Sequence, residues 1–324
     1  MKLIRGLHNL QYQAASDVAS APSVRALLAR GCVATIGNFD GVHLGHQAIL
    51  AQVKAKAAEL GVPSVVVVFE PQPREYFAGD QAPPRLMRFR EKLVALEQEG
   101  VDIVVCLQFN QRLRSLTAEQ FVQQVLIDGL MIRHLVVGDD FRFGCDRAGD
   151  FHLLEQVGAE KGFGVEHTQT FEIGGERVSS TRVRKSLAAS DFDLAYRMMG
   201  RPFSMGGRVI HGAKLGRQLG VPTANIAIGR RHSPLTGVFA VEVLVPGESS
   251  PLPAVANVGI RPSVNGTKPL LEVHLLDFSR SIYGARLQVI FRAKLRDEQR
   301  FPSLDALKAR IEQDIQAARS FFGV

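Results

Sequence analysis

The sequence predicts an α/β domain built on a parallel sheet, followed by a small antiparallel β-barrel and a terminal helix. Three observations predict this fold class. Apolar runs alternate with helical patterns in the first half, short strands bounded by Gly, Pro and Asn follow the segment 186–202, and an amphipathic pattern comes last. The 324 residues have room for two domains of ordinary size. We place these domains at 1–186 and 187–324.

The first domain shows the alternation of a parallel α/β sheet. Strands are predicted at 32–37, 65–69, 103–106 and 134–138, and helices at 45–60, 90–99 and 118–127. Continuous apolar strands separated by helices are typical of a sheet that is covered on both faces. We expect right-handed strand–helix connections.

The second domain has the pattern of a small barrel. Strands are predicted at 208–210, 237–245, 254–258, 271–276 and 287–293. Several short strands at this spacing favour an antiparallel barrel. A final helix is expected from about Ser303 to Phe322, because Leu304, Leu307 and Ile311 recur on one face.

Composition narrows the class of protein. Hydrophobic residues make up 46% of the chain and charged residues 22%, as in an ordinary globular protein. No apolar run approaches the roughly 18 residues that cross a bilayer, and no signal sequence is apparent, so we expect a cytoplasmic protein without a membrane partner. The three cysteines lack metal-site spacing and are expected to be reduced thiols.

The net charge of +7 lies entirely in the second domain. Residues 187–324 hold 18 Lys and Arg against 11 Asp and Glu. A basic domain suits an anionic partner, namely nucleic acid, a membrane or a nucleotide phosphate. Net charge alone does not distinguish among these three partners. No basic patch is interleaved with aromatic residues, as it is in proteins that bind single-stranded nucleic acid.

A glycine-rich turn follows the first strand of the α/β domain. It reads Gly37-Asn38-Phe39-Asp40-Gly41-Val42-His43-Leu44-Gly45-His46. Its glycines allow close backbone approach to a ligand, and the following helix directs free N–H groups at a phosphate. The alternative is a tight turn with two surface histidines. The position after the first strand of a parallel sheet favours the phosphate site.

A second candidate phosphate segment lies at 179–184. Ser179, Ser180 and Thr181 offer hydroxyl donors, and Arg182 and Arg184 can clamp phosphate oxygens. Alone it is a weak motif, because Ser or Thr is common at helix starts. Together with the histidine turn it can complete a triphosphate site.

The second domain opens with another glycine-rich stretch, 206–226. Gly212, Lys214 and Gly216 can form a basic phosphate loop that is not a Walker motif. In the sequence PTAN, Thr223 and Asn225 offer oxygen atoms of the kind that Mg²⁺ prefers. A Gly- and Pro-rich β-turn is an equally good interpretation of this stretch taken alone.

One carboxylate stands at the start of an apolar strand. Glu272 is unexpected there unless it faces solvent on an edge strand or faces a site. A general base at that position could accept the proton of an attacking hydroxyl.

Taken in order, these motifs resemble those of the bacterial bifunctional riboflavin kinase/FAD synthetase family. Residues 37–47 resemble its adenylyltransferase signature, 69–77 a loop near the flavin, and 137–144 a loop that closes on nucleotide and flavin. Residues 179–184 resemble its second phosphate segment, 206–226 its kinase signature, and 271–278 the segment with its catalytic glutamate.

The resemblance implies a Rossmann-like nucleotidyltransferase domain and a riboflavin kinase-like barrel. It implies that the enzyme phosphorylates riboflavin with ATP to FMN, then adenylylates FMN with ATP to FAD and pyrophosphate, with Mg²⁺ as cofactor. The implied catalytic residues are Glu272, His43 and His46, and the metal ligands are Thr223 and Asn225. The implied binding residues are Gly37, Asn38, Phe39, Asp40, Asp140, Ser180, Thr181, Arg182, Arg184, Gly212, Lys214 and Gly216.

Two rival functions remain open at the level of sequence. A nucleotidyltransferase acting on phosphopantetheine or a polyol phosphate explains residues 37–46 but gives PTAN and Glu272 no role. A nucleic-acid-binding protein explains the charge but not the histidine turn, and it predicts duplex binding with steep salt dependence. Loss of one activity would require a lost key residue, and none is apparent.

Overall fold

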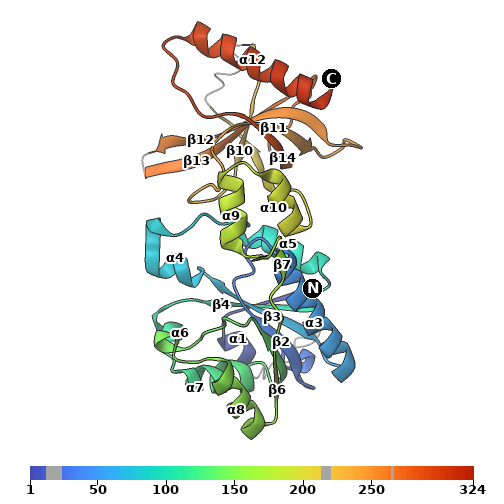
Figure 1. Ribbon diagram of the computed structural model, residues 1–324, viewed down its shortest axis with the longest axis vertical. Coiled ribbons are helices and arrows are strands. Elements are labelled where there is room, and N and C mark those ends of the chain that lie inside the picture. The colour runs from blue at the N-terminus through green and yellow to red at the C-terminus, as the bar shows by residue number, and fades with distance from the viewer. Residues whose placement is uncertain (12–23, 213–219, 264–265) are drawn as a thin grey trace. The chain divides into compact units, whose positions relative to one another are not determined.

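The chain forms two compact units in the computed structural model. The structure describes every residue except 12–23, 213–219 and 264–265. One unit comprises Met1–Pro83 and Phe89–Val178, and the other comprises Pro84–Arg88 and Ser179–Val324. Figure 1 shows the elements of both.

The first unit is built on a six-stranded parallel sheet of order β1-β4-β3-β2-β5-β6. The strands are β1 (Lys2–Arg5), β2 (Cys32–Ile36), β3 (Ser64–Glu70), β4 (Ile103–Gln108), β5 (Ile132–Val137) and β6 (Gly164–His167). The chain runs from β2 outward to β3 and β4, then returns to place β5 on the other side of β2. The carboxyl ends of β2 and β5 therefore flank the switch point, where open α/β sheets bind ligands.

Helices and a short hairpin complete the first unit. The longer helices are α3 (Leu44–Leu60), α5 (Phe89–Gln98) and α8 (Phe151–Lys161). The shorter elements are α1 (His8–Gln11), α2 (Val24–Leu27), α4 (Pro73–Ala78), η1 (Gly79–Gln81), α6 (Gln111–Arg114), α7 (Ala118–Phe121), η2 (Val122–Ile127), η3 (Cys145–Arg147), β7 (Glu172–Ile173) and β8 (Glu176–Arg177).

The core of this unit covers both faces of the sheet. On one face, Ile36, Val67 and Val105 pack in a large buried cluster with Leu126 and Phe121. On the other face, α3 packs on Val33 and Val136. Every residue of β2 is buried. The unbroken apolar runs in the sequence follow from this double burial.

The second unit is a closed antiparallel barrel. Its strands follow the order β10-β13-β12-β11-β14-β9, and β9 pairs with β10 to close it. The strands are β9 (Ser204–Ile210), β10 (Ala224–Ala227), β11 (Gly237–Leu244), β12 (Leu252–Ser263), β13 (Gly266–Leu275) and β14 (Arg286–Arg296). Phe239 and Phe291 are fully buried and lie edge to face at 5.3 Å.

Three helices accompany the barrel in the part of the second unit that the structure describes. They are α9 (Ser180–Ala188), α10 (Phe192–Met199) and α12 (Leu304–Phe322). Ala318 and Ile315 of α12 pack against Ala240 and Val255 on the outer face of the barrel. Ser303 caps α12 by accepting a hydrogen bond from the Ala306 N–H.

The predicted fold class is confirmed, with differences in individual elements. The predicted helix 118–127 is wrong in its second half, because α7 continues into the π-helical segment η2. The strands β1, β6 and β10 and the helices α8 and α10 had not been predicted. The three strands have only four residues each, which leaves little room for a periodic pattern.

Candidate functional site

The first candidate site is the turn between β2 and α3. It lies at the switch point of the sheet, and the loop after β5 begins on the neighbouring strand. Phe39 and Val42 have positive φ angles of 45° and 38°, which non-glycine residues adopt rarely. Both are buried, with exposures of 1% and 0%. Strain of this kind is held only where the surroundings enforce it, commonly at a ligand site.

The two histidines of this turn form one stacked pair. The rings of His43 and His46 have centroids 3.7 Å apart and an interplanar angle of 15°. His43 is the N-cap of α3, and its Nδ1 accepts a hydrogen bond from the His46 N–H at 3.3 Å. In the neutral ring, Nε2 therefore carries the proton and is the donor. The pair thus offers ring donors at a helix N-terminus, where anions bind well.

Gly45 permits the close packing of this pair. A Cβ at position 45 would lie 3.3 Å from both His43 Nδ1 and the Val178 carbonyl oxygen. Phe39 packs on His46 with ring centroids 4.8 Å apart. Asp40 is 1% exposed. The Asn38 Oδ1 atom is buried and makes no hydrogen bond within the described part of the chain. An orphaned buried acceptor of this kind fits a ligand donor.

Asp140 is placed in the loop after β5, as part of an ion-pair network. Its Oδ1 accepts a hydrogen bond from Arg177 Nη2 at 2.9 Å, and Arg177 also lies 3.3 Å from Asp139. A hydrogen bond from Thr170 Oγ1 is the main cause that lowers the pKa of Asp139. Arg177 stands in the two-residue strand β8 and belongs to no motif of the sequence.

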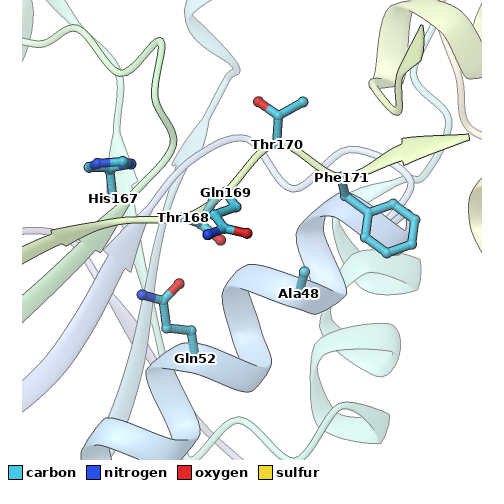
Figure 2. A pocket seen from close by; sticks show the side chains of 7 residues that line it. All are labelled: Ala48, Gln52, His167, Thr168, Gln169, Thr170 and Phe171. Carbon is cyan, nitrogen blue, oxygen red and sulfur yellow. The ribbon is translucent and has the colours of Figure 1, made fainter. Parts of the chain in front are cut away.

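A pocket of about 480 Å³ opens beside α3. It is lined by Ala48, Gln52, His167, Thr168, Gln169, Thr170 and Phe171, and Figure 2 shows the two helix residues facing the segment that follows β6. A hydrogen bond orients the Gln52 side chain, because its Nε2 donates to Glu166 Oε2 at 3.0 Å. No motif in the sequence marks this segment as part of a site.

Aromatic side chains gather where β3 and β4 end. Tyr76 and Phe77 of α4 lie edge to face with Phe109, at 5.3 and 5.8 Å. Arg114 lies over the Phe77 ring at 5.2 Å, and Phe77 is 62% exposed. This aromatic cluster of Tyr76, Phe77, Phe109 and Arg114 is a ready platform for a flat ring. The sequence motif at 69–77 pointed to only part of it.

The predicted phosphate segment at 179–184 forms the start of α9. Ser179 is its N-cap and accepts a hydrogen bond from the Arg182 N–H at 3.2 Å. Thr181 is exposed, whereas Ser180 and Arg182 are half-buried. Arg184 Nε donates to the Pro84 carbonyl at 2.6 Å, so part of this guanidinium is engaged by the backbone.

The second candidate site lies on the outer face of the barrel. Strand register places Asn225 of β10 opposite Glu272 of β13, and Glu272 opposite Asn257 of β12. Directly paired residues of antiparallel strands point to the same side. Asn225, Glu272 and Asn257 therefore form a polar row, with Thr223 next to the start of β10.

The glycine-rich stretch meets this polar row directly. A Cβ at Gly212 would lie 2.5 to 2.6 Å from the Asn225 carboxamide, so only glycine fits there. Asn225 is 8% exposed under it. His274 Nδ1 lies 2.9 Å from the Pro222 carbonyl oxygen and ties β13 to the PTAN segment. The predicted residues Lys214 and Gly216 lie outside the described residues.

The oxygen donors in this row suit a hard divalent cation. The Thr223 hydroxyl, the Asn225 carboxamide and the nearby Glu272 carboxylate are the ligand types that Mg²⁺ accepts. In the part of the chain that the structure describes, no three His, Cys, Asp or Glu residues cluster to hold a metal. Over the same residues, no helix is long and apolar enough to cross a membrane.

Comparison with known proteins follows the same division of the chain. The FAD synthetase family model matches residues 26–182, and the riboflavin kinase family model matches residues 199–322. A bifunctional riboflavin kinase/FMN adenylyltransferase from Pseudomonas fluorescens is 58% identical over 321 residues, covering 99% of this chain and 97% of that protein.

Other relatives match over the full length. The protein of the same description from Escherichia coli K12 is 51% identical over 324 residues, covering 100% of this chain and 99% of its own. A crystal structure from Streptococcus pneumoniae, described as a macrolide-efflux protein, is 27% identical with a TM-score of 0.78. It covers 98% of this chain and 99% of that one.

Proposed function

The chain belongs to the bifunctional riboflavin kinase/FMN adenylyltransferase family, and from this we infer the division of labour between its two sites. It is a transferase that phosphorylates riboflavin to FMN and adenylylates FMN to FAD, with ATP as co-substrate. We assign FMN adenylylation to residues 1–186 and riboflavin phosphorylation to residues 187–324.

For adenylyl transfer, we propose that the histidine turn holds the phosphates of ATP. An FMN phosphate oxygen attacks the α-phosphorus, and the bond to the pyrophosphate oxygen breaks. No protein nucleophile is needed, so the site acts by alignment and charge stabilisation. His43 and His46 would donate to the phosphates, and Asn38 and Asp40 would position the substrates. The stacked histidines at the N-terminus of α3 support this role.

Substrate subsites around this turn follow from the same geometry. Ala48 and Gln52 lie one and two helical turns beyond Leu44, so the pocket in Figure 2 is spaced to take the base of a nucleotide whose phosphates sit at His43. We propose that the aromatic cluster contacts the isoalloxazine ring of FMN. From the family resemblance alone, we propose that Ser180, Thr181, Arg182 and Arg184 bind the leaving pyrophosphate.

For phosphoryl transfer, we propose that Glu272 is the general base. It accepts the proton of the riboflavin 5′-hydroxyl while that oxygen attacks the γ-phosphorus of ATP, and ADP leaves. Thr223 and Asn225 would hold Mg²⁺, which neutralises charge on the transferred group when bound. The glycine-rich stretch with Gly212, Lys214 and Gly216 would carry the ATP phosphates. The observation that carries this assignment is the polar row Asn225–Glu272–Asn257.

The test separates riboflavin, FMN and FAD by chromatography after incubation with ATP and Mg²⁺. The Glu272→Gln variant should lose on the order of 10²–10⁴ in kinase rate and still convert supplied FMN to FAD. Normal FMN formation in this variant would refute the base assignment. Binding of duplex DNA with steep salt dependence, without flavin turnover, would instead support the nucleic-acid rival. Cytoplasmic location and the absence of a nucleic-acid partner remain predictions.

A further inference from the structure

A second carboxylate lies beside the proposed kinase base, and neither the motifs nor the assignment above uses it. Glu298 follows β14 and precedes α12. Its Oε1 occupies the space that a Cβ at Gly259 would need, so the absence of a side chain at 259 allows the approach. Asn257 Nδ2 lies 3.6 Å from the same point. Glu298 therefore sits against the outer face of β12, at the end of the polar row.

Strand register relates this position to Glu272. Gly259 is two residues beyond Asn257 on β12, so both point to the outer face of the barrel. Asn257 pairs directly with Glu272. The Glu298 carboxylate thus lies about one same-face step, roughly 7 Å along the strand, beyond the Glu272 row.

Electrostatics agrees with this proximity. Loss of water around the Glu298 carboxyl, which lies against the Gly259 backbone, is the largest cause that raises its pKa. The charge of Glu272 raises it further, while Arg296 acts in the opposite direction. The two carboxylates therefore lie close enough for the charge of Glu272 to affect the pKa of Glu298.

Ion pairs hold the residues next to Glu298, whereas its own carboxylate has no partner among the residues that the structure describes. Arg296 forks onto Asp314 of α12 at 2.8 Å through both Nε and Nη2. Asp297 pairs with Lys294 at 2.5 Å. Within the described ranges of the chain, the Glu298 carboxylate makes no hydrogen bond and no ion pair. Glu298 is exposed to solvent, and its carboxylate oxygens are available to a ligand.

We propose that Glu298 accepts a hydrogen bond from a secondary hydroxyl of the ribityl chain of riboflavin. A polyol that places its terminal hydroxyl at Glu272 extends further hydroxyl donors along its chain, and a carboxylate one step away is the matching acceptor. Glu298 is then a substrate-binding residue that selects for the hydroxylated chain, distinct from the base. This inference rests on the proposed location of the kinase site.

The experiment measures kinase kinetics with riboflavin varied at saturating ATP. Glu298→Gln should lower kcat/KM for riboflavin on the order of 10–100-fold, because a charge-assisted hydrogen bond is weakened. The KM for ATP and the adenylylation of supplied FMN should stay at wild-type values. Asp297→Asn is the matched control, since its carboxylate is 84% exposed and pairs with Lys294. It should change kcat/KM by no more than about twofold.

A substrate analogue distinguishes a contact from a structural role. A flavin with a 5-hydroxypentyl chain keeps the terminal hydroxyl and lacks the secondary ones. Wild type and Glu298→Gln should phosphorylate it with kcat/KM values within about twofold of each other. As a second variant, Gly259→Ala should displace the Glu298 carboxylate and reproduce the selective loss with riboflavin. An unchanged kcat/KM for riboflavin, an equal penalty with the analogue, or a raised KM for ATP would overturn the proposal.

The failure of this proposal can be told apart from failure of the kinase assignment. If Glu272→Gln abolishes phosphorylation and Glu298→Gln leaves riboflavin kinetics intact, only the role of Glu298 is wrong. If Glu272→Gln remains fully active, the kinase site itself has been misplaced.

Discussion

At the scale of single residues, the two sites depend on positions where a side chain is absent. Gly45 lets His43 pack against the start of α3, and Gly212 lies directly on the Asn225 carboxamide. Each glycine stands next to a residue with a proposed chemical role. These two glycines therefore allow a neighbouring group to approach the backbone closely. Gly41 has a different role, because it adopts a positive φ of 91°.

Gly45→Ala should impair adenylyl transfer selectively. The new Cβ would press on His43 Nδ1 and on the Val178 carbonyl oxygen, each at 3.3 Å, and the backbone oxygen has little freedom to yield. We expect at least about a tenfold fall in kcat/KM for FMN, since a small misplacement of aligned groups is costly. FMN formation from riboflavin serves as the internal control and should be unchanged. A wild-type rate of FAD formation would show that the histidine pair tolerates movement.

Asn225→Ala should raise the Mg²⁺ requirement of the kinase reaction. Removal of the carboxamide takes away one proposed oxygen ligand beside Glu272, so half-maximal activity should need on the order of tenfold more Mg²⁺. The measurement is a Mg²⁺ titration of FMN formation at fixed ATP. Asn257→Ala is the control on the other side of Glu272 and is expected to leave the Mg²⁺ midpoint unchanged. Equal midpoints in wild type and Asn225→Ala would remove Asn225 from the metal site.

The sequence predicted residues of this kind unevenly. The histidine turn could be found because its spacing is local and it follows a strand directly. Asn225 was predicted as a metal ligand, but its position beside Glu272, with Asn257 on the other side, could not be predicted because it depends on barrel register. Arg177 and Glu298 were missed for the same reason. Each acts through a contact with residues at least 37 positions away in sequence.

At the scale of elements, polar contacts connect α3 to the sheet next to the pocket. Glu166 of β6 accepts from Gln52 at 3.0 Å and lies 3.4 Å from His134 Nε2 of β5 and 3.7 Å from Lys56 Nζ of α3. The hydrogen bond from Gln52 is the main cause that lowers the pKa of Glu166, and the charges of His134 and Lys56 add to it. Burial lowers the pKa of His134.

These shifts predict how stability depends on pH. Because the pKa of Glu166 is lowered in the folded state from 4.5, its contribution is present above about pH 4.5 and is lost as the pH falls through the folded value. Glu166 is 40% exposed, so solvent screening keeps the contribution below about 1 kcal/mol. Glu166→Gln should therefore lower the Tm at pH 7 and show a shallower decline below pH 4.5. Glu59→Gln, which removes another partner of Lys56, should show a smaller effect. Parallel Tm–pH curves for wild type and Glu166→Gln would contradict this account.

The attachment of α12 to the barrel depends on one buried ion pair. Arg296 is 10% exposed and Asp314 5%, and they form three hydrogen bonds of 2.8 to 3.0 Å. Asp314→Asn should destabilise the kinase unit by roughly 3–5 kcal/mol, because the buried guanidinium loses its counter-charge. Asp277→Asn removes the more exposed pair with Arg319 and should cost about 1 kcal/mol or less. The measurement is urea unfolding, and similar midpoints for the two variants would contradict the ranking.

Long elements with a clear period were predicted well, whereas short ones were missed. Helices α3 and α12 span 17 and 19 residues, and both were expected. The strands β1, β6 and β10 have four residues each. Over its six residues, the π-helical segment η2 has the same apolar spacing as an α-helix. The spacing therefore does not distinguish a π-helical turn from an α-helical one.

At the scale of the whole molecule, the two candidate sites are built on two unrelated architectures. One lies at the switch point of a parallel sheet, and the other lies on the outer face of a closed barrel. The fold of each unit follows from alternation patterns in its own part of the sequence. The family motifs follow one another in order along the chain, and the two family models match residues 26–182 and 199–322. Both reactions are therefore assigned to one chain.

The most direct test of this separation uses riboflavin, ATP and Mg²⁺ with His46→Ala, Glu272→Gln and an equimolar mixture of the two. The account predicts that His46→Ala stops at FMN and that Glu272→Gln leaves riboflavin unphosphorylated but converts supplied FMN to FAD. The mixture should then make FAD from riboflavin through released FMN. If either single variant lost both reactions while remaining folded, or if His46→Ala still formed FAD from FMN at the wild-type rate, the assignment of one chemistry to residues 1–186 and the other to residues 187–324 would be wrong.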